Sequence, residues 1–581
     1  MSGLGVARVA HVLREYALLA DGERGAIMGP HGDITWLCVP RWDSPSVFAT
    51  LVGGAGCYCV TPTARHVWGG YYEEGSMIWR NRWVTETGMI ESREALAFPA
   101  HADRAVVLRH VHALDTSAEL DVSLVPRGGY DTVRPTQLRR DGGVWTMRVG
   151  DLRLRWSGAR AARPRDHGNE LGFRLRLDPG ERHDLVLEIG DGALPDELPD
   201  ASALWQATEA AWQAEVPALS DVLDSRDSRR SYAVMRGLTS NGGGMVAAAT
   251  TSLPERAEAG RNYDYRYVWI RDQCYAGQAA AAAGGHGLLD AAVDFVAARL
   301  LDDGERLSPA YTTRGDPVPD QQHLELPGYP GGYDIVGNWV NKQFQLDAFG
   351  EALQLFAAAA RLGRLDETRQ RAAEIAADAI ARRWTEPDAG IWEIDDRAWT
   401  HSRLTAAGGL RVAAAECSSG RSSAEWLTLA DRIVADTAQS SLHPDGRWQR
   451  APDDPGHDAA LLLPGLRGAV PADDPRTIAT LDTYLRELTV DGYAYRFRHD
   501  DRPLAQAEGA FLLCGFLVAL GEHKRGNAVE ARAWYERTRA ACGPAQLYSE
   551  EFDSDQHQLR GNLPQAFVHA LHLESAARLA S

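Results

Sequence analysis

The sequence has few cysteines, and their spacing does not match the usual metal-binding or disulfide patterns. Seven cysteines occur in 581 residues, an odd number at low density, and no CxxC pair or Cys/His cluster has zinc-binding spacing. Cys57 and Cys59 are two positions apart, which is poor for a metal chelate. We therefore expect reduced thiols, as in a reducing compartment, and neither a metal nor another cofactor.

Long apolar runs and excess positive charge are also missing. No apolar run is long enough to predict a membrane span, and the N-terminus lacks the basic and then apolar segments of a signal peptide. These absences predict a cytoplasmic protein. The formal net charge of −19 repels phosphate backbones, which argues against a nucleic-acid partner and is compatible with a neutral substrate. Nothing in the sequence predicts the oligomeric state.

The first 200 residues predict β-structure. Segments such as RAVVLRHVHAL, AELDVSLV and HDLVLEIGDG mostly alternate apolar and polar residues, and turn sequences such as DGG and DPGE separate strands of this kind. Period-two alternation with this punctuation indicates antiparallel strands that each have one face in a core. Several such strands in succession predict an N-terminal antiparallel β-sandwich domain over residues 1–200.

From residue 201 the pattern becomes helical. Residues 201–230 are interpreted as a helical linker, and residues 231–581 contain about a dozen Ala- and Leu-rich segments of helical length and period. That number suits a closed ring of helical hairpins, an (α/α)6 barrel. An α-solenoid is the alternative, but no fixed-period repeat supports it. The predicted fold class is multidomain β + α, a sandwich followed by an (α/α)6 barrel catalytic domain whose functional residues lie in the connectors.

One connector, NYDYRYVWIRDQ (262–273), combines aromatic rings with a charged pair. Tyr265 and Trp269 offer flat apolar faces, while Arg271 and Asp272 offer directional hydrogen bonds. A sugar ring, with its apolar CH face and polar edge, suits that combination. The alternative interpretation is an aromatic core patch with one ion pair, because aromatic residues usually report burial.

A second connector, GIWEIDDRAWTHSR (390–403), places Glu393 between Trp392 and Ile394. An apolar setting disfavours the charged form of a carboxyl group and raises its pKa. A carboxyl group that is still protonated near neutral pH could protonate the leaving oxygen of a glycoside. The alternative is a glutamate that faces water, and Asp395 and Asp396 are expected to be solvated.

The third motif, LYSEEFDSDQ (547–556), carries two adjacent glutamates. Neighbouring residues of an extended chain point in opposite directions, so we expect only one of Glu550 and Glu551 to face a site, where it could act as a general base. Asp553 is expected to serve a turn. Two separated carboxylates beside an aromatic/Arg/Asp platform match the requirements of glycoside hydrolysis, in which an acid and a second carboxylate flank the scissile bond.

These segments, taken in order, resemble glycoside hydrolase family 15, the glucoamylase-like enzymes. The resemblance spans nearly the whole chain: GPHGDITWLCVPRWDSPSVFATLVGG, YDYRYVWIRD, GIWE, EGAFLLCGF, SEEFD and GNLPQAFVHALHL. It implies a β-sandwich followed by an (α/α)6 barrel, and inverting hydrolysis of α-glucosidic bonds at a non-reducing end. By the resemblance, Glu393 matches the general acid and Glu550 the general base. The residues matched to substrate binding are Tyr265, Trp269, Arg271, Asp272, Trp392 and Arg496.

The sequence departs from the family pattern at two places. The stretch GYPGGYDIVGN (328–338) is shorter than the loop of bacterial relatives and lacks its Ser-x-Pro-Val-Arg core. That loop is expected to lie close to the substrate, so it bears on which sugar is accepted. Gly390 and Ile394 stand where fungal relatives carry acidic residues around the acid, which predicts a more apolar environment for Glu393.

The predicted function is an exo-acting α-glucoside hydrolase that releases β-glucose from an α-glucan or α-glucosyl oligosaccharide. Trehalase and isomalto-oligosaccharide glucohydrolase are alternatives within the family, and a non-catalytic carbohydrate-binding protein is the alternative from another class. A phosphorylase is disfavoured by the second carboxylate, Glu550. A metalloenzyme is disfavoured because no HExxH motif occurs, and His569 and His572 are interpreted as helix-face histidines.

Overall fold

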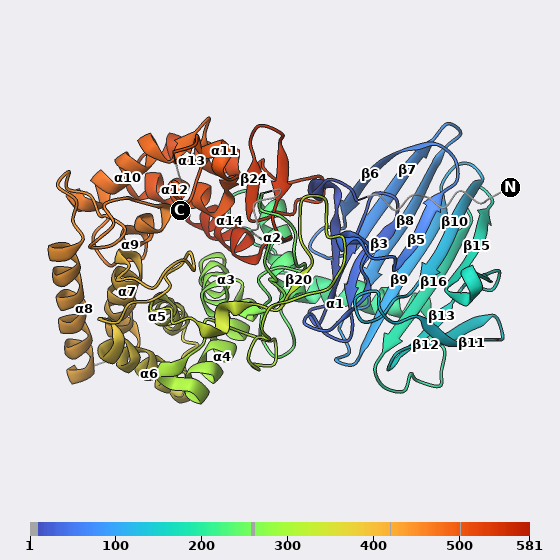
Figure 1. The fold of residues 1–581 in the computed structure, drawn as a ribbon, viewed down its shortest axis with the longest axis horizontal. Coiled ribbons are helices and arrows are strands. Elements are labelled where there is room, and N and C mark those ends of the chain that lie inside the picture. Colours follow the sequence, from blue (N-terminus) through green and yellow to red (C-terminus); the bar gives the residue numbers. More distant parts are fainter. Residues whose placement is uncertain (1–9, 257–261, 419, 500) are drawn as a thin grey trace.

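The computed structural model describes residues 10–256, 262–418, 420–499 and 501–581. A β-sandwich lies at one end of the molecule and a ring of helices at the other (Figure 1). Within the described ranges, the sandwich consists of two eight-stranded antiparallel sheets, in the orders β1-β2-β3-β5-β10-β15-β14, with β4 beside β3, and β11-β12-β13-β16-β9-β8-β7-β6. The strands are β1 (Ala17–Ala20), β2 (Gly25–Met28), β3 (Asp33–Cys38), β4 (Ser46–Phe48), β5 (Cys57–Pro62), β6 (His66–Tyr72), β7 (Trp79–Thr85), β8 (Met89–Leu96), β9 (Arg104–Ala113), β10 (Ala118–Val125), β11 (Pro135–Asp141), β12 (Val144–Val149), β13 (Leu152–Ser157), β14 (Arg163–Arg165), β15 (Glu170–Leu177) and β16 (Arg182–Gly190).

Alternation gives these strands one face toward the core. In β15, Phe173, Leu175 and Leu177 are buried, while Arg174 and Arg176 between them are exposed. Successive side chains of a strand point to opposite faces, so this pattern turns the apolar residues inward. The predicted antiparallel β-sandwich is confirmed.

Helix α1 (Ala201–Glu215) follows the sandwich and packs against it. It begins at Ala201 because the side chain of Asp200 accepts hydrogen bonds from two backbone N–H groups of the first turn. Near its end, the ring of Trp212 stacks on Phe98 with 4.5 Å between ring centroids. The connector between the two parts of the molecule is therefore a helix anchored on the sandwich.

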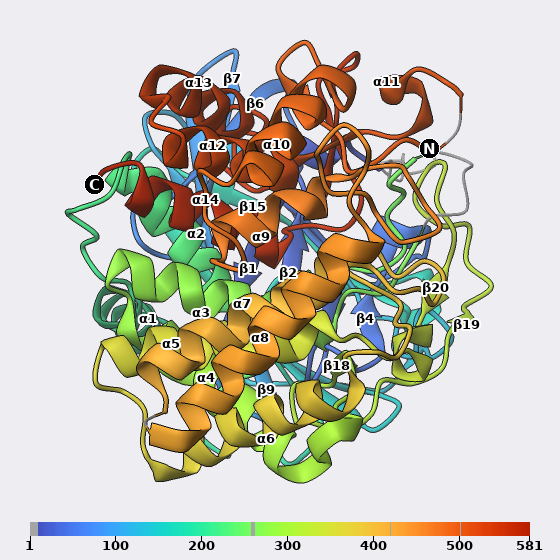
Figure 2. The ribbon, with the colours of Figure 1, turned by 90° about the vertical axis from the view of Figure 1, so that its left-hand side faces the viewer.

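The contacts between the remaining helices arrange them in an inner and an outer ring. Figure 2 views the molecule from the helical end, with α8 in front. In the described part of the chain, six inner helices each contact the next, and the last contacts the first. They are α3 (Ile270–Ala283), α5 (Asp347–Arg361), α7 (Thr400–Glu416), α9 (Leu463–Leu466, a single turn after the 3-10 helix η6, Ala459–Leu462), α12 (Leu512–Lys524) and α14 (Ala566–Arg578). Outside them lie α2 (Ser225–Leu238), α4 (His286–Asp303), α6 (Glu367–Arg383), α8 (Gly420–Ser440), α10 (Pro475–Glu487) and α13 (Ala528–Arg539). Closure of the inner ring makes this an (α/α)6 barrel and excludes the solenoid alternative.

Short strands and one further helical turn order the connectors between these helices. The pairs are β17 (Val268–Trp269) with β18 (Ala310–Tyr311), β19 (Gln322–His323) with β20 (Ile335–Val336), β21 (Thr489–Val490) with β22 (Tyr493–Ala494), and the three-stranded β23 (Ala510–Phe511), β24 (Glu551–Asp553) and β25 (Gln558–Arg560); the turn is α11 (Leu504–Ala507). None of the helices in the described part of the chain combines the length and apolarity needed to span a bilayer.

The five longer inner helices point the same way. Their first turns, or the connectors that lead into them, line one cavity, and their last turns line another of about 370 Å³ at the opposite end. Basic residues gather at that opposite end, where helix carbonyl groups favour cations. They are Arg361, Arg467, Lys524 and Arg578.

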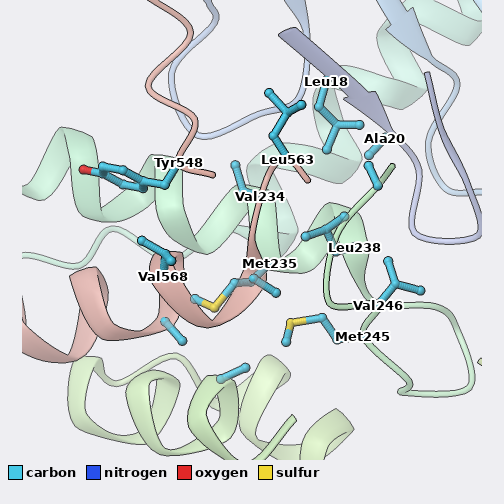
Figure 3. Packing of buried hydrophobic residues seen from close by; sticks show 14 of the residues in the cluster. Leu18, Ala20, Val234, Met235, Leu238, Met245, Val246, Tyr548, Leu563 and Val568 are labelled. Atoms are coloured by element: carbon cyan, nitrogen blue, oxygen red, sulfur yellow. The ribbon is translucent and has the colours of Figure 1, made fainter. Parts of the chain in front are cut away.

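The sandwich and the barrel share one hydrophobic core. Figure 3 shows Leu18 and Ala20 of β1 beside Val234 and Leu238 of α2. All four side chains are almost fully buried. Because apolar side chains from both parts fill this contact, the barrel is held on the sandwich by burial of apolar surface as well as by polar contacts.

Two buried histidines of α14, His569 and His572, take part in a series of hydrogen bonds that links four side chains. His569 Nε2 accepts the backbone N–H of Tyr548 at 3.3 Å, so its Nδ1 carries the proton that is donated to Ser231 Oγ at 3.0 Å. Ser231 in turn donates to His572 Nδ1 at 2.9 Å, and His572 Nε2 donates to Tyr535 at 3.1 Å. Both imidazoles are neutral in this arrangement.

We expect replacement of His572 by glutamine to flatten the dependence of stability on pH. Burial lowers the pKa of His572 from 6.5 to about 4. Between these values the unfolded chain binds a proton that the folded chain does not, so the free energy of unfolding falls as the pH falls. One such group contributes about 1.4 kcal/mol per pH unit.

Urea denaturation at several pH values in this window measures the effect. The wild-type midpoint is expected to fall more steeply on acidification than that of His572→Gln, and the exposed control His167→Gln is expected to follow the wild type. Equal slopes for wild type and His572→Gln would contradict the assignment of a neutral, buried imidazole.

Candidate active site

A cavity of about 290 Å³ opens at the end of the barrel where the inner helices begin. Its volume is near the lower end of small-molecule sites, which span roughly 300–1,000 Å³. Trp269, Phe511 and Gln565, which immediately precede α3, α12 and α14, all line it. The eight residues that the sequence nominates also line this one cavity: Tyr265, Trp269, Arg271, Asp272, Trp392, Glu393, Arg496 and Glu550.

Glu393 lies in a tight turn before α7. Its φ is +53°, in the left-handed region that non-glycine residues rarely adopt. The turn is held by the buried carboxylate of Asp388, which accepts hydrogen bonds from the N–H groups of Leu346 and Gly390 and from the hydroxyl of Ser402. Burial raises the pKa of Asp388 to about 8.

The turn directs the Glu393 carboxylate toward polar groups. Its Oε1 accepts hydrogen bonds from Trp269 Nε1 at 2.7 Å and Gln345 Nε2 at 3.0 Å, and Arg271 Nη2 lies 3.5 Å away. The apolar setting predicted from its sequence neighbours is therefore wrong. The reason is that left-handed backbone turns Glu393 away from Trp392, which packs on Phe511, and from Ile394, which is 42% exposed.

Arg271 and Asp272 occupy the first turn of α3. Arg271 Nη1 donates to Gln345 Oε1 at 2.8 Å and lies 3.4 Å from the fully buried Asp347. These contacts connect Arg271 with the same glutamine that holds Glu393. Asp272 is almost fully buried, and burial raises its pKa to about 7 although Arg271 opposes the shift.

Glu550 lines the same cavity. The hydroxyl of Tyr265 lies 3.3 Å from its Oε1 and 3.2 Å from its Oε2. Burial raises the pKa of Glu550 well above its ordinary range, and the neighbouring carboxyl of Glu255 acts in the same direction. Glu551 points elsewhere, since its Oε2 accepts the N–H of Gly509 at 2.9 Å. The two glutamates diverge as alternation predicts.

Arg496 lies beside the base candidate and is shared among carboxylates. Its Nη2 lies 3.1 Å from Glu255, 2.9 Å from Glu508 and 3.3 Å from Glu551. The sequence nominates Arg496 but not Glu255, which is 3% exposed and also lines the cavity. Glu255 follows Pro254 in a stretch that resembles no catalytic motif, so the sequence alone offered no signal for it. Gln345 was missed for the same reason.

The other carboxylates of these motifs lie outside the cavity lining. Asp395 and Asp396 are exposed, as expected. Asp553 accepts the N–H groups of Asp555 and Gln556, which gives it the turn role that was predicted.

The loop 328–338 contacts the sandwich at its start and other barrel connectors along the rest of its length. The N–H of Gly328 donates to the carbonyl of Val52, and the hydroxyl of Tyr329 donates to the carbonyl of His11 at 2.6 Å. Within the loop, Asn338 is the residue that lines the cavity. Of this loop, the last residue therefore lines the cavity. Ile335 and Gly337 are hydrogen-bonded to Ser252 and Asp264 of other connectors.

Residues of the aromatic motif also attach it to the sandwich. Arg266 and Asp264 form an ion pair at 2.6 Å between fully buried side chains. Arg266 also donates to the carbonyl oxygens of Trp42 and Ser44, while Asp264 accepts the N–H of Gly337. Asp264 and Arg266 thus point toward the sandwich and the 328–338 loop, whereas Tyr265, which lies between them in the chain, lines the cavity.

Comparison with known protein families identifies the family of this chain. The model of "Glycosyl hydrolases family 15" matches residues 230–577, and the model "Trehalase-like, N-terminal" matches residues 6–159. The chain belongs to glycosyl hydrolases family 15. Its family resemblance, fold class and nature as a glycoside hydrolase are thereby confirmed.

Relatives of this family 15 enzyme match over nearly its whole length. The trehalase of Mycolicibacterium smegmatis is 30% identical, with 96% of this chain and 89% of the relative covered. The trehalase of Thermoplasma acidophilum is 25% identical over 95% of this chain and 98% of its own. A bacterial glucoamylase complexed with acarbose superposes with a TM-score of 0.71 at 15% identity, covering 98% of this chain and 96% of that one. At that identity the superposition shows the shared fold.

Proposed function

We propose that this family 15 enzyme hydrolyses α,α-trehalose to two molecules of glucose, with inversion at the carbon that is attacked. The observation that carries the proposal is the full-length similarity to proteins named trehalase, which includes the N-terminal domain. From the sequence, the main predicted substrate is an α-glucan or α-glucosyl oligosaccharide, and trehalose is an alternative within the family. The relatives named trehalase favour trehalose as the substrate.

Glu393 acts as the general acid in this proposal. Trp269, Gln345 and Arg271 hold one carboxylate oxygen, which leaves the other oxygen to carry the proton that is donated to the glycosidic oxygen. Asp272 is buried beside Arg271 and accepts a hydroxyl of the bound glucose. Tyr265 and Trp269 contact its apolar face.

Glu550 acts as the general base. It takes a proton from a water molecule as that water attacks the anomeric carbon from the face opposite the leaving sugar. Inversion requires room for this water, and inverting carboxyl pairs are roughly 6.5–9.5 Å apart. The buried position of Glu550 raises its pKa and so makes it a stronger base than an exposed glutamate once it is ionised.

The test is a substrate panel of trehalose, maltose, isomaltose and maltotetraose followed by proton NMR. We expect trehalose to be hydrolysed fastest. Inversion at one anomeric carbon of α,α-trehalose releases β-glucose, while the leaving sugar departs as α-glucose. Early spectra, recorded before mutarotation, are therefore expected to show the two anomers in equal amounts.

Each other outcome has a defined meaning. Release of α-glucose alone would indicate retention and would overturn the roles of Glu393 and Glu550. Faster hydrolysis of maltotetraose than of trehalose would restore the α-glucan assignment. Formation of glucose 1-phosphate in phosphate buffer would indicate phosphorolysis, and no turnover of any α-glucoside would overturn the proposed function.

A further inference from the structure

A second buried carboxyl, that of Glu255, lies beside Glu550. The two residues are 3% and 4% exposed, and both line the cavity. Gly561 lies against both, because a Cβ on this glycine would come within 3.5 Å of Glu255 Cγ and of Glu550 Cβ. A side-chain hydrogen bond with the Glu255 carboxyl is among the interactions that raise the pKa of Glu550. Two carboxyl groups can share a hydrogen bond only when one of them carries a proton.

The backbone fixes Glu255 at this place. The carbonyl of Pro254 accepts the N–H of Gly561 at 2.8 Å. Asn562 Oδ1 accepts the hydroxyl of Thr250 at 2.8 Å and the N–H of Leu253 at 3.4 Å. The segment that carries Glu255 is thus attached directly to the chain just beyond the Glu550 motif, so the carboxyl pair is part of the built site.

The surrounding charges favour retention of one proton. Arg496 contacts Glu255, Glu508 and Glu551, and it also lowers the pKa of Glu550. Among the residues that the structure describes, the Arg496 guanidinium therefore acts on four carboxyl groups, and His499 contacts one of them, Glu508. In the described part of the chain, the titratable and charged groups that act on or are acted on by Glu550 include Glu255, Tyr263, Tyr265, Arg496 and Glu551.

We propose that Glu255 is a positioning residue for the base: it shares a hydrogen-bonded proton with Glu550 and thereby sets the lowest pH at which Glu550 can accept a proton from water. The inference rests on the proposed function, in which Glu550 is the base. The pair titrates as a unit. Glu550 is active once the shared proton has left, and below that pH the water cannot be activated.

Replacing Glu255 by glutamine tests this directly. An amide can donate a hydrogen bond to the Glu550 carboxylate and carries no charge, so the variant stabilises the ionised base. We expect the acid limb of the kcat/KM profile for trehalose to move to lower pH by about one unit or more, since kcat/KM reports the free enzyme. At the pH plateau, kcat is expected to stay within about tenfold of the wild type, because the acid and the base both remain.

The matched control is Glu508→Gln. It removes a carboxyl group that also contacts Arg496 but does not line the cavity, and we expect it to move the acid limb less than Glu255→Gln does. Circular dichroism and thermal melting establish that each variant is folded. If Glu255→Gln does not fold, Glu255→Asp withdraws the carboxyl by one methylene group and is expected to shift the limb in the same direction.

An acid limb that stays in place in the folded Glu255 variant would overturn the inference while leaving the proposed function intact. A raised KM with an unchanged pH profile would also overturn it, because Glu255 would then be a substrate ligand. If Glu255→Gln and Glu508→Gln moved the acid limb equally, the shift would follow from the loss of one negative charge near Arg496. That result would also overturn the pairing of Glu255 with Glu550. Failure of the wild type to hydrolyse trehalose would instead overturn the proposed function.

Discussion

Replacement of Glu550 by glutamine is expected to lower kcat for trehalose by about 10²–10⁴-fold, and replacement of Glu393 by glutamine by a similar factor. Glutamine has nearly the same shape as glutamate but can neither accept the proton of the attacking water nor donate one to the leaving oxygen. Substrate binding is expected to survive, because Tyr265, Arg271 and Asp272 remain in the cavity. Initial rates of glucose release measure kcat, and quenching of tryptophan fluorescence by trehalose measures binding.

Asp396→Asn is the control for this pair. Asp396 lies in the same connector as Glu393 but is exposed and does not line the cavity, so its replacement is expected to change kcat less than twofold. Wild-type activity in either glutamine variant would remove that residue from the mechanism. Loss of binding together with activity would point to a structural role.

Replacement of Arg266 by methionine is expected to destabilise the protein by about 3–5 kcal/mol. The change leaves the carboxylate of Asp264 buried without its cation, and it removes the hydrogen bonds to the carbonyl groups of Trp42 and Ser44 in the sandwich. Because Tyr265 lies between Asp264 and Arg266, we also expect kcat to fall. The shift of the urea unfolding midpoint measures the first effect.

A double variant separates the two contributions. Asp264→Leu combined with Arg266→Met removes the whole ion pair and leaves no unpaired buried charge, so it is expected to recover part of the stability that Arg266→Met loses. If Arg266→Met unfolded at the same urea concentration as the wild type, the buried ion pair would make no contribution to the free energy of unfolding.

Much of the fold and of the site's composition was predictable because it depends on local patterns. Alternation identifies strands such as β15, and the helical period identifies the barrel helices. Short motifs that resemble family 15 point to Glu393, Glu550 and Arg271, which all line one cavity. These features are specified within short stretches of sequence, where periodicity and residue chemistry act directly.

What could not be predicted depends on residues that meet only in the folded chain. The setting of Glu393 is polar because a left-handed turn directs it to Gln345, which belongs to another connector. Glu255 meets Glu550 because two remote backbone segments are hydrogen-bonded to each other through Gly561. Arg266 looks like part of the sugar motif in sequence, yet its side chain is committed to the sandwich.

The common direction of the longer inner helices gives the barrel an electrostatic polarity. Each helix carries a partial positive charge at its start and a partial negative charge at its end. Several starts surround the cavity that holds Asp272, Glu393 and Glu550, and the opposite ends surround Arg467 and Lys524. The barrel axis therefore has one end that lowers the cost of burying carboxylates and another that lowers the cost of burying cations. A reaction that depends on two glutamates fits the first end and would be disfavoured at the second.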